Sequence, residues 1–142
     1  FLAGATGIGA LGASLMIAFR GDIIEKGRFI ALAGLAFSLS LFALAVSRDY
    51  YLSILLLILA GWGAVSFFAV ANSFIQLSTP DNLRGRVMSV YTLFFLGFAP
   101  FGNFVLGSVA DLAGTPGAVI AGSIVCFVTT VMLFKSMKAL RR

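Results

Sequence analysis

The amino-acid sequence predicts an all-α membrane protein with five transmembrane helices. Hydrophobic residues make up 61% of the 142 residues and charged residues only 11%, whereas about a quarter of the residues in soluble domains are charged. The ten basic and five acidic residues leave five uncharged stretches of at least 19 residues each, and about 20 helical residues cross the hydrocarbon core of a bilayer. A soluble protein would have to bury five complete helices in one small domain. The expected spans are about 1–19, 29–47, 50–78, 82–110 and 116–134.

The basic residues alternate between the two ends of the expected helices. Lys and Arg number three in 20–28, two in 81–86 and four in 135–142, against one in 48–49 and none around 111–117. Loops rich in Lys and Arg stay in the cytoplasm, so we expect residue 1 on the outer side and the C-terminal tail in the cytoplasm. The net charge of +5 then reflects topology, and no nucleic-acid partner is expected.

The first span is crowded with small residues. Ala5, Gly9 and Ala13 form one stripe at i, i+4 spacing, and such stripes allow helices to approach closely in lipid. A second stripe consists of Thr6, Ala10, Ser14 and Ala18. The two stripes predict a helix that packs in protein on more than one side.

The second span ends in a charged pair, Arg48–Asp49. Tyr50 and Tyr51 follow directly, and aromatic residues of this kind are typical of the membrane–water interface. We therefore expect spans two and three to form a tight helical hairpin on the outer side.

The third span is the longest, and its second half is polar. It carries two amides, Asn72 and Gln76, whose spacing of four residues places them on one face of a helix. Amides at membrane depth are costly unless they meet a partner or a water-filled cavity. Two interpretations stay open: the amides bond a neighbouring helix, or they line a polar pathway. Trp62 and Phe68 are weaker candidates for the same lining, because aromatic residues at these depths more often pack.

The fourth span is expected to begin before its uncharged run. Thr79 is a suitable N-cap, Pro80 a suitable first helical residue and Asp81 a suitable charge for the first turn. Further along, Pro100 is expected to kink the helix. Asn103 follows this kink and is another candidate for a cavity wall.

Residues 72–114 combine three features: an amide-bearing helix, a P-D-x-x-R-G-R connector, and a helix with P-x-G-x-x-x-x-G and a closing glycine. The residues are Gln76, Pro80, Asp81, Arg84, Gly85, Arg86, Pro100, Gly102, Gly107 and Gly114. This segment resembles the tenth and eleventh helices of the major facilitator superfamily, in particular bacterial efflux proteins such as enterobactin and macrolide exporters. The loop RGDIIEKGRF, at 20–29, resembles a weaker copy of the superfamily's charged cytoplasmic loop.

The resemblance implies that the five spans are helices eight to twelve of a twelve-helix transporter, within one half-bundle of that fold, in a bacterial inner membrane. Either the chain is part of a longer one, or it is a short homologue with another role. The resemblance also implies that the charged cytoplasmic loops hold an inner gate closed, with partners in the missing N-terminal half-bundle. The residues expected to take part in gating are Asp22, Lys26, Arg28, Asp81, Arg84, Arg86 and Pro100.

The expected function is part of a secondary active transporter that exports a small amphipathic molecule by alternating access. The substrate cavity is expected to be lined by Asn72, Gln76, Asn103, Trp62 and Phe68. The alternative is a non-transporting subunit that packs with other membrane subunits in the bilayer. We expect no enzyme, metal site or cofactor, because the chain has no histidine and one cysteine and no acid pair within its spans.

Overall fold

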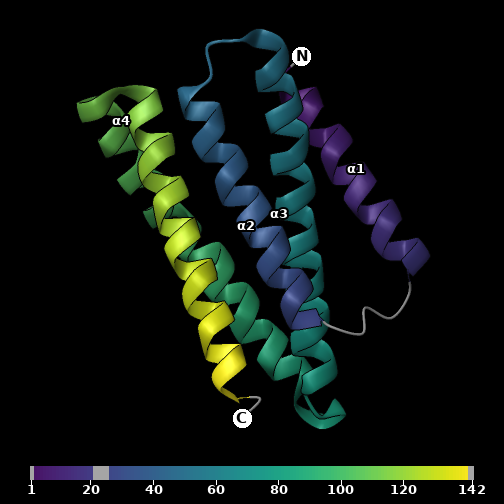
Figure 1. Ribbon diagram of the computed structural model, residues 1–142. Coiled ribbons are helices and arrows are strands. Elements are labelled where there is room, and N and C mark those ends of the chain that lie inside the picture. Colours follow the sequence, from purple (N-terminus) through teal and green to yellow (C-terminus); the bar gives the residue numbers. More distant parts are fainter. Residues whose placement is uncertain (1, 21–25, 141–142) are drawn as a thin grey trace.

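The computed structural model describes residues 2–20 and 26–140 (Figure 1). Its helices are α1 (Leu2–Arg20), α2 (Lys26–Val46), α3 (Tyr50–Ser78) and α4 (Asp81–Leu140). Within 26–140, only the short connections 47–49 and 79–80 separate one helix from the next. The described part of the chain has no strand, so the prediction of an all-α fold is confirmed.

Helix α4 consists of two arms that run in opposite directions (Figure 1). The only residue within it that leaves helical geometry is Gly114, with φ 75° and ψ 166°, a conformation that glycine adopts at little steric cost. We call 81–113 the first arm and 115–140 the second arm. Pro100 lies within the first arm, and its dihedral angles are helical. The kink expected at Pro100 stays a prediction, whereas the reversal at Gly114 was not expected from the sequence.

The helices do not pack in the order of the chain. Helix α3 lies between α1 and α2, and α2 in turn packs on α4. The second arm of α4 provides this contact: a Cβ on Gly34 of α2 would lie 2.8 Å from the Thr130 hydroxyl oxygen and 3.4 Å from the Phe67 ring. Gly34 therefore lies where three helices meet.

Glycines set the closest approach, between α1 and α3. A Cβ on Gly9 would collide with the carbonyl oxygen of Ile58, and one on Gly61 would collide with the carbonyl oxygen of Thr6. Ala5 and Ala13 are 4% and 0% exposed, so the first predicted stripe is confirmed as a packing surface.

Half of the second predicted stripe of α1 is covered: Thr6 and Ala10 are half-buried. Ser14 and Ala18 are exposed, and α1 packs chiefly on α3. In the described part of the chain α3 is the main partner of α1, and packing of α1 on more than one side stays a prediction.

The core is built from small residues, and the large apolar side chains face outward. The largest fully buried side chains are serines, Ser38, Ser66 and Ser123. Phe19 and Leu112, in contrast, are 88% and 90% exposed. Lipid is as apolar as leucine, so membrane helices associate through close packing and not through burial of large side chains. The exposure pattern is that of a bundle surrounded by lipid.

Among the described residues, length and composition allow three helices to cross a membrane. The crossing segments are Gly27–Val46, Tyr50–Ser78 and Asp81–Lys135, with Ala3–Phe19 as a shorter apolar helix. The ends that carry nearly all Lys and Arg of the sequence lie together: the end of α1, the start of α2, the α3–α4 turn and the end of α4 (Figure 1). We call this the basic end. The α2–α3 turn and the Gly114 reversal lie at the opposite end (Figure 1).

Asp49 fixes the α2–α3 turn. Its carboxylate accepts a hydrogen bond from the backbone N–H of Tyr51 at 3.0 Å, so it caps α3. The Ser53 hydroxyl donates to the carbonyl oxygen of Asp49 at 2.7 Å. The rings of Tyr50 and Tyr51 meet edge to face, with centroids 5.8 Å apart. These contacts close a short helical hairpin between α2 and α3.

Candidate functional site

A groove of about 300 Å³ lies between the last turns of α3 and the first turns of α4, at the basic end. Its lining residues are Ala69, Asn72, Ser73, Gln76, Leu77 and Arg84. Two of the five predicted cavity residues, Asn72 and Gln76, are among them. The lining combines amide, hydroxyl and guanidinium groups, which can form hydrogen bonds, with apolar side chains.

The two amides bond each other. Gln76 Nε2 donates to Asn72 Oδ1 at 2.5 Å. Asn72 is half-buried and Gln76 is exposed. In the described part of the chain neither amide bonds a neighbouring helix, so their contacts differ from the first of the two interpretations drawn from the sequence.

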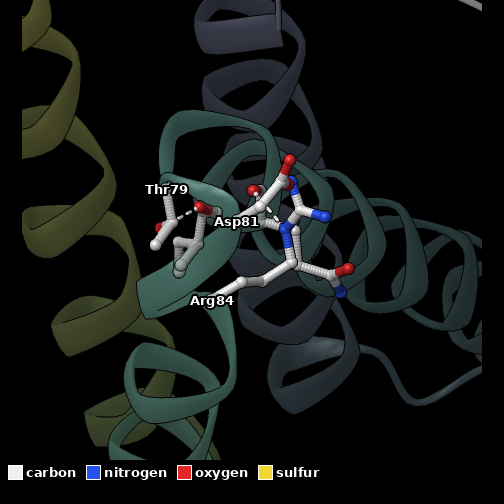
Figure 2. Close-up of polar contacts among 5 residues, drawn as sticks. Thr79, Asp81 and Arg84 are labelled. Atoms are coloured by element: carbon white, nitrogen blue, oxygen red, sulfur yellow. Dashed lines mark hydrogen bonds and ion pairs between the residues drawn. The ribbon is translucent and has the colours of Figure 1, made fainter.

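Arg84 joins the end of α3 to the start of α4 (Figure 2). Its Nη2 lies 2.6 Å from the Asp81 carboxylate, and its Nε donates to the backbone carbonyl of Gln76 at 3.2 Å. The side chains of Arg84 and Asp81 are 43% and 88% exposed, and ion pairs so open to solvent contribute little stability. We call this arrangement the Arg84 clamp. The resemblance implies that Arg84 has a partner in the other half-bundle. In the structure its partners lie at the end of α3 and the start of α4.

Thr79 does not cap the helix that follows it (Figure 2). Its hydroxyl donates backward to the carbonyl of Ile75 at 2.7 Å, and its backbone N–H donates to the carbonyl of Gln76. The carbonyl of Pro80 accepts the first bond of α4, from the N–H of Arg84 at 3.0 Å. The predicted roles of Thr79 and Pro80 are therefore wrong: Thr79 satisfies free carbonyls at the end of α3, and Pro80 precedes the first helical residue.

An aromatic cluster continues from the groove toward the middle of the bundle. Phe68 lies four residues before Asn72 on α3, and its ring centroid is 5.2 Å from that of Phe95 on the first arm of α4. Phe95 stacks on Tyr91 at 6.2 Å, with 14° between the rings, and Phe67 meets Phe68 edge to face at 5.5 Å. We use the name aromatic cluster for these four residues. Phe68 thus lies beside the groove, although it does not line it.

The other predicted cavity residues lie elsewhere. The Trp62 ring meets Phe29 edge to face at 6.2 Å and lies next to the α1–α3 crossing at Gly9, so it packs between helices. Asn103 is exposed on the first arm and does not line the groove.

The remaining predicted gating residues are spread along the basic end and the first arm. Arg28, Arg86 and Pro100 are exposed, and Arg86 has no ion-pair partner among the described residues. Asp22 lies outside the described residues. Lys26 begins α2, but its side chain lies outside the described part.

Sequence reasoning missed Ser73, Leu77 and the α4 side of the aromatic cluster. Ser73 and Leu77 follow Ala69 at spacings of four residues, on the stripe next to Asn72 and Gln76. On α4, residues 84, 91 and 95 recur at intervals of seven and four, which places them on one helix face. The spacings predict one face on α3 and one on α4, but only the structure shows that these two faces meet.

Among the residues that the structure describes, no three His, Cys, Asp or Glu side chains are grouped so that they could hold a metal ion. The charged groups at the groove are Arg84 and the nearby Asp81, which are paired. The site is therefore described by its hydrogen-bonding and apolar groups.

Replacing Arg84 by glutamine is expected to loosen the α3–α4 turn. The change removes the Asp81 ion pair and the bond to the Gln76 carbonyl, and the expected cost is below about 1 kcal/mol because both contacts are near solvent. Hydrogen exchange of the peptide that contains residues 76–84 would measure the loss of protection. Arg86→Gln is the matched control, since it removes the same charge from the same turn without touching the clamp. Equal exchange in the two variants would contradict the role of the Arg84 clamp.

A family model described as "transmembrane secretion effector", of the major facilitator type, matches residues 1–141. Comparisons with curated proteins and with solved structures give no match.

Proposed function

Because the chain belongs to the transmembrane secretion effector family of the major facilitator superfamily, we propose that it is part of a secondary active transporter that exports a small amphipathic molecule. Membership in the family supports a transport role and a small-molecule substrate. Alternating access between two half-bundles is the mechanism that we propose for it. The groove between α3 and α4 is the observation that carries the proposal for this part of the protein.

The position of the groove supports export. It lies at the basic end, and Lys and Arg mark the cytoplasmic side of a membrane protein. We therefore propose that the basic end faces the cytoplasm of a bacterial inner membrane. A molecule to be exported would reach Asn72 and Gln76 from that side.

Five membrane crossings follow from the same orientation. Helices α1, α2 and α3 each cross once, and the two arms of α4 cross separately, with the reversal at Gly114 on the outer side. We propose that the start of α1 lies outside and the end of α4 in the cytoplasm.

The first arm of α4 supports a further packing partner. Gly97, Gly102 and Gly107 have open space where a side chain would be, and Phe101 and Phe104 beside them are 70% and 75% exposed. We propose that the other half-bundle of the transporter covers this arm. The charged residues of the basic end would then contribute to gating, with the Arg84 clamp opening or closing as the two halves move.

The test is transport by the full natural protein in everted inner-membrane vesicles. Energised vesicles should accumulate at least one member of a panel of labelled amphipathic compounds (2-naphthamide, rhodamine 6G and tetraphenylphosphonium) above vesicles that lack the protein. Protonophore and monensin together should abolish the accumulation, because secondary transport depends on an ion gradient. If none of the panel accumulates, the proposed function fails, and a non-transporting membrane subunit becomes the better account.

A further inference from the structure

The amide pair in the groove keeps both kinds of hydrogen-bonding capacity. Each carboxamide has two N–H donors and one oxygen acceptor. After the bond from Gln76 to Asn72, Gln76 retains its oxygen and one N–H, and Asn72 retains both N–H groups. A ligand that fits this pair carries a donor and an acceptor next to each other.

The charges at the groove are already compensated. Arg84, the only ionisable lining residue, is paired with Asp81 at 2.6 Å and bonded to the Gln76 carbonyl. An anionic ligand would have to compete with the Asp81 carboxylate for the guanidinium group. A cationic ligand finds no carboxylate in the lining with which to pair. Both signs of charge are therefore disfavoured in comparison with a neutral group.

The aromatic cluster offers a place for an apolar body. Phe68 and Asn72 are separated by one helical turn on the same side of α3, and Phe68 contacts Phe95 across the hairpin. From residue 68 to residue 77 the helix rises about 14 Å, which is enough for a fused aromatic ring system with a short polar head. The polar end of this path lies at the basic end, and the aromatic end lies deeper.

We propose that this groove is the cytoplasmic entry subsite of the transporter and that it selects molecules with an uncharged, hydrogen-bonding head, such as a carboxamide, on an aromatic body. The inference rests on the proposed function, because it names the substrate class of the same groove. Asn72 and Gln76 bind the head, Arg84 stays paired with Asp81, and Phe68 and Phe95 contact the body.

The test compares three tritiated probes that share a naphthalene body: 2-naphthamide, 2-naphthoate and (2-naphthylmethyl)trimethylammonium. Binding to the full natural protein in lipid nanodiscs is measured directly, with protein-free nanodiscs subtracted. The carboxamide is expected to bind at least about tenfold more tightly than either charged probe, and Gln76→Leu is expected to reduce its affinity about tenfold, the effect of one lost hydrogen bond. Thr129→Val is the matched control, because it removes a polar group from an exposed helix face outside the groove.

Equal affinity for the three probes, tighter binding of a charged probe, or no binding of the carboxamide would each overturn the proposed selectivity. The order of affinities in the unmodified protein decides this even if a variant fails to fold. Carboxamide binding without accumulation in vesicles would overturn the transport function and leave the selectivity of the groove. Accumulation of a charged compound in vesicles, without tighter binding of the carboxamide, would overturn the selectivity of the groove and leave the transport function.

Discussion

Replacing Gly9 by alanine is expected to lower the free energy of unfolding of the bundle by about 1–3 kcal/mol, the range for added volume in a well-packed core. The new Cβ would collide with the carbonyl oxygen of Ile58 and would lie 2.9 Å from the backbone nitrogen of Trp62. Both contacts are with backbone atoms, which cannot rotate away as a flexible side chain could. Helices α1 and α3 would have to move apart along the whole crossing.

The matched control for this change lies two residues earlier on the same helix. A Cβ on Gly7 has nothing within 4 Å, so Gly7→Ala should be neutral or stabilise by up to about 1 kcal/mol through helix propensity. Unfolding in mixed micelles, followed by circular dichroism as the SDS fraction rises, would measure both variants. Equal midpoints for the two would show that α1 does not depend on the close approach at Gly9.

Replacing Ser73 by phenylalanine is expected to lower transport at least about tenfold, since the loss of substrate contacts equivalent to about 1.4 kcal/mol is sufficient for that factor. Ser73 is exposed and lines the groove. A ring at this position would occupy the space beside Asn72 and Gln76. Initial rates of uptake into energised everted vesicles would measure the effect.

The control places the same ring on α3 away from the groove. Leu59 is 43% exposed and does not line the groove, so Leu59→Phe should leave both transport and stability nearly unchanged. Normal transport by Ser73→Phe at normal abundance in the membrane would show that the substrate does not pass through this groove.

The fold class could be predicted from the sequence because charge placement alone restricts it. A soluble domain of this size would have to bury five complete helices, whereas a bilayer accommodates each uncharged stretch as a spanning helix. The face shared by Asn72 and Gln76 could also be predicted, since helical periodicity fixes it without knowledge of the neighbours.

The order of packing could not be predicted in the same way. Gly9 predicts a close contact, but nothing in its own stripe shows that the contact is with Ile58 and Trp62 on α3 and not with the adjacent helix α2. The capping role of Thr79 could not be predicted for a related reason. A hydroxyl between two helices can satisfy the end of one or the start of the other, and local sequence does not decide between them.

The partners of Arg84 were missed because the sequence was interpreted through a resemblance that placed them in another part of the transporter. The spacing of three residues between Asp81 and Arg84 indicates a local pair on a helix, and this simpler interpretation agrees with the contact at 2.6 Å. Trp62 and Asn103 were predicted to line the cavity but do not line the groove, for a geometric reason. The type of side chain indicates which contacts it can make, whereas the packing of the helices determines which neighbours it meets.

The reversal at Gly114 lets a small change of angle between the two arms of α4 produce a large displacement at their far ends. A single non-helical residue joins the two arms. This connection is too short for one arm to slide along the other. Relative motion is confined to a change of angle. Because Arg84 lies 30 residues from the joint, a distance of about 45 Å along the helix, a tilt of only about 5° displaces that end by about 4 Å. In the proposed transporter, a small rotation at Gly114 would therefore open or narrow the groove.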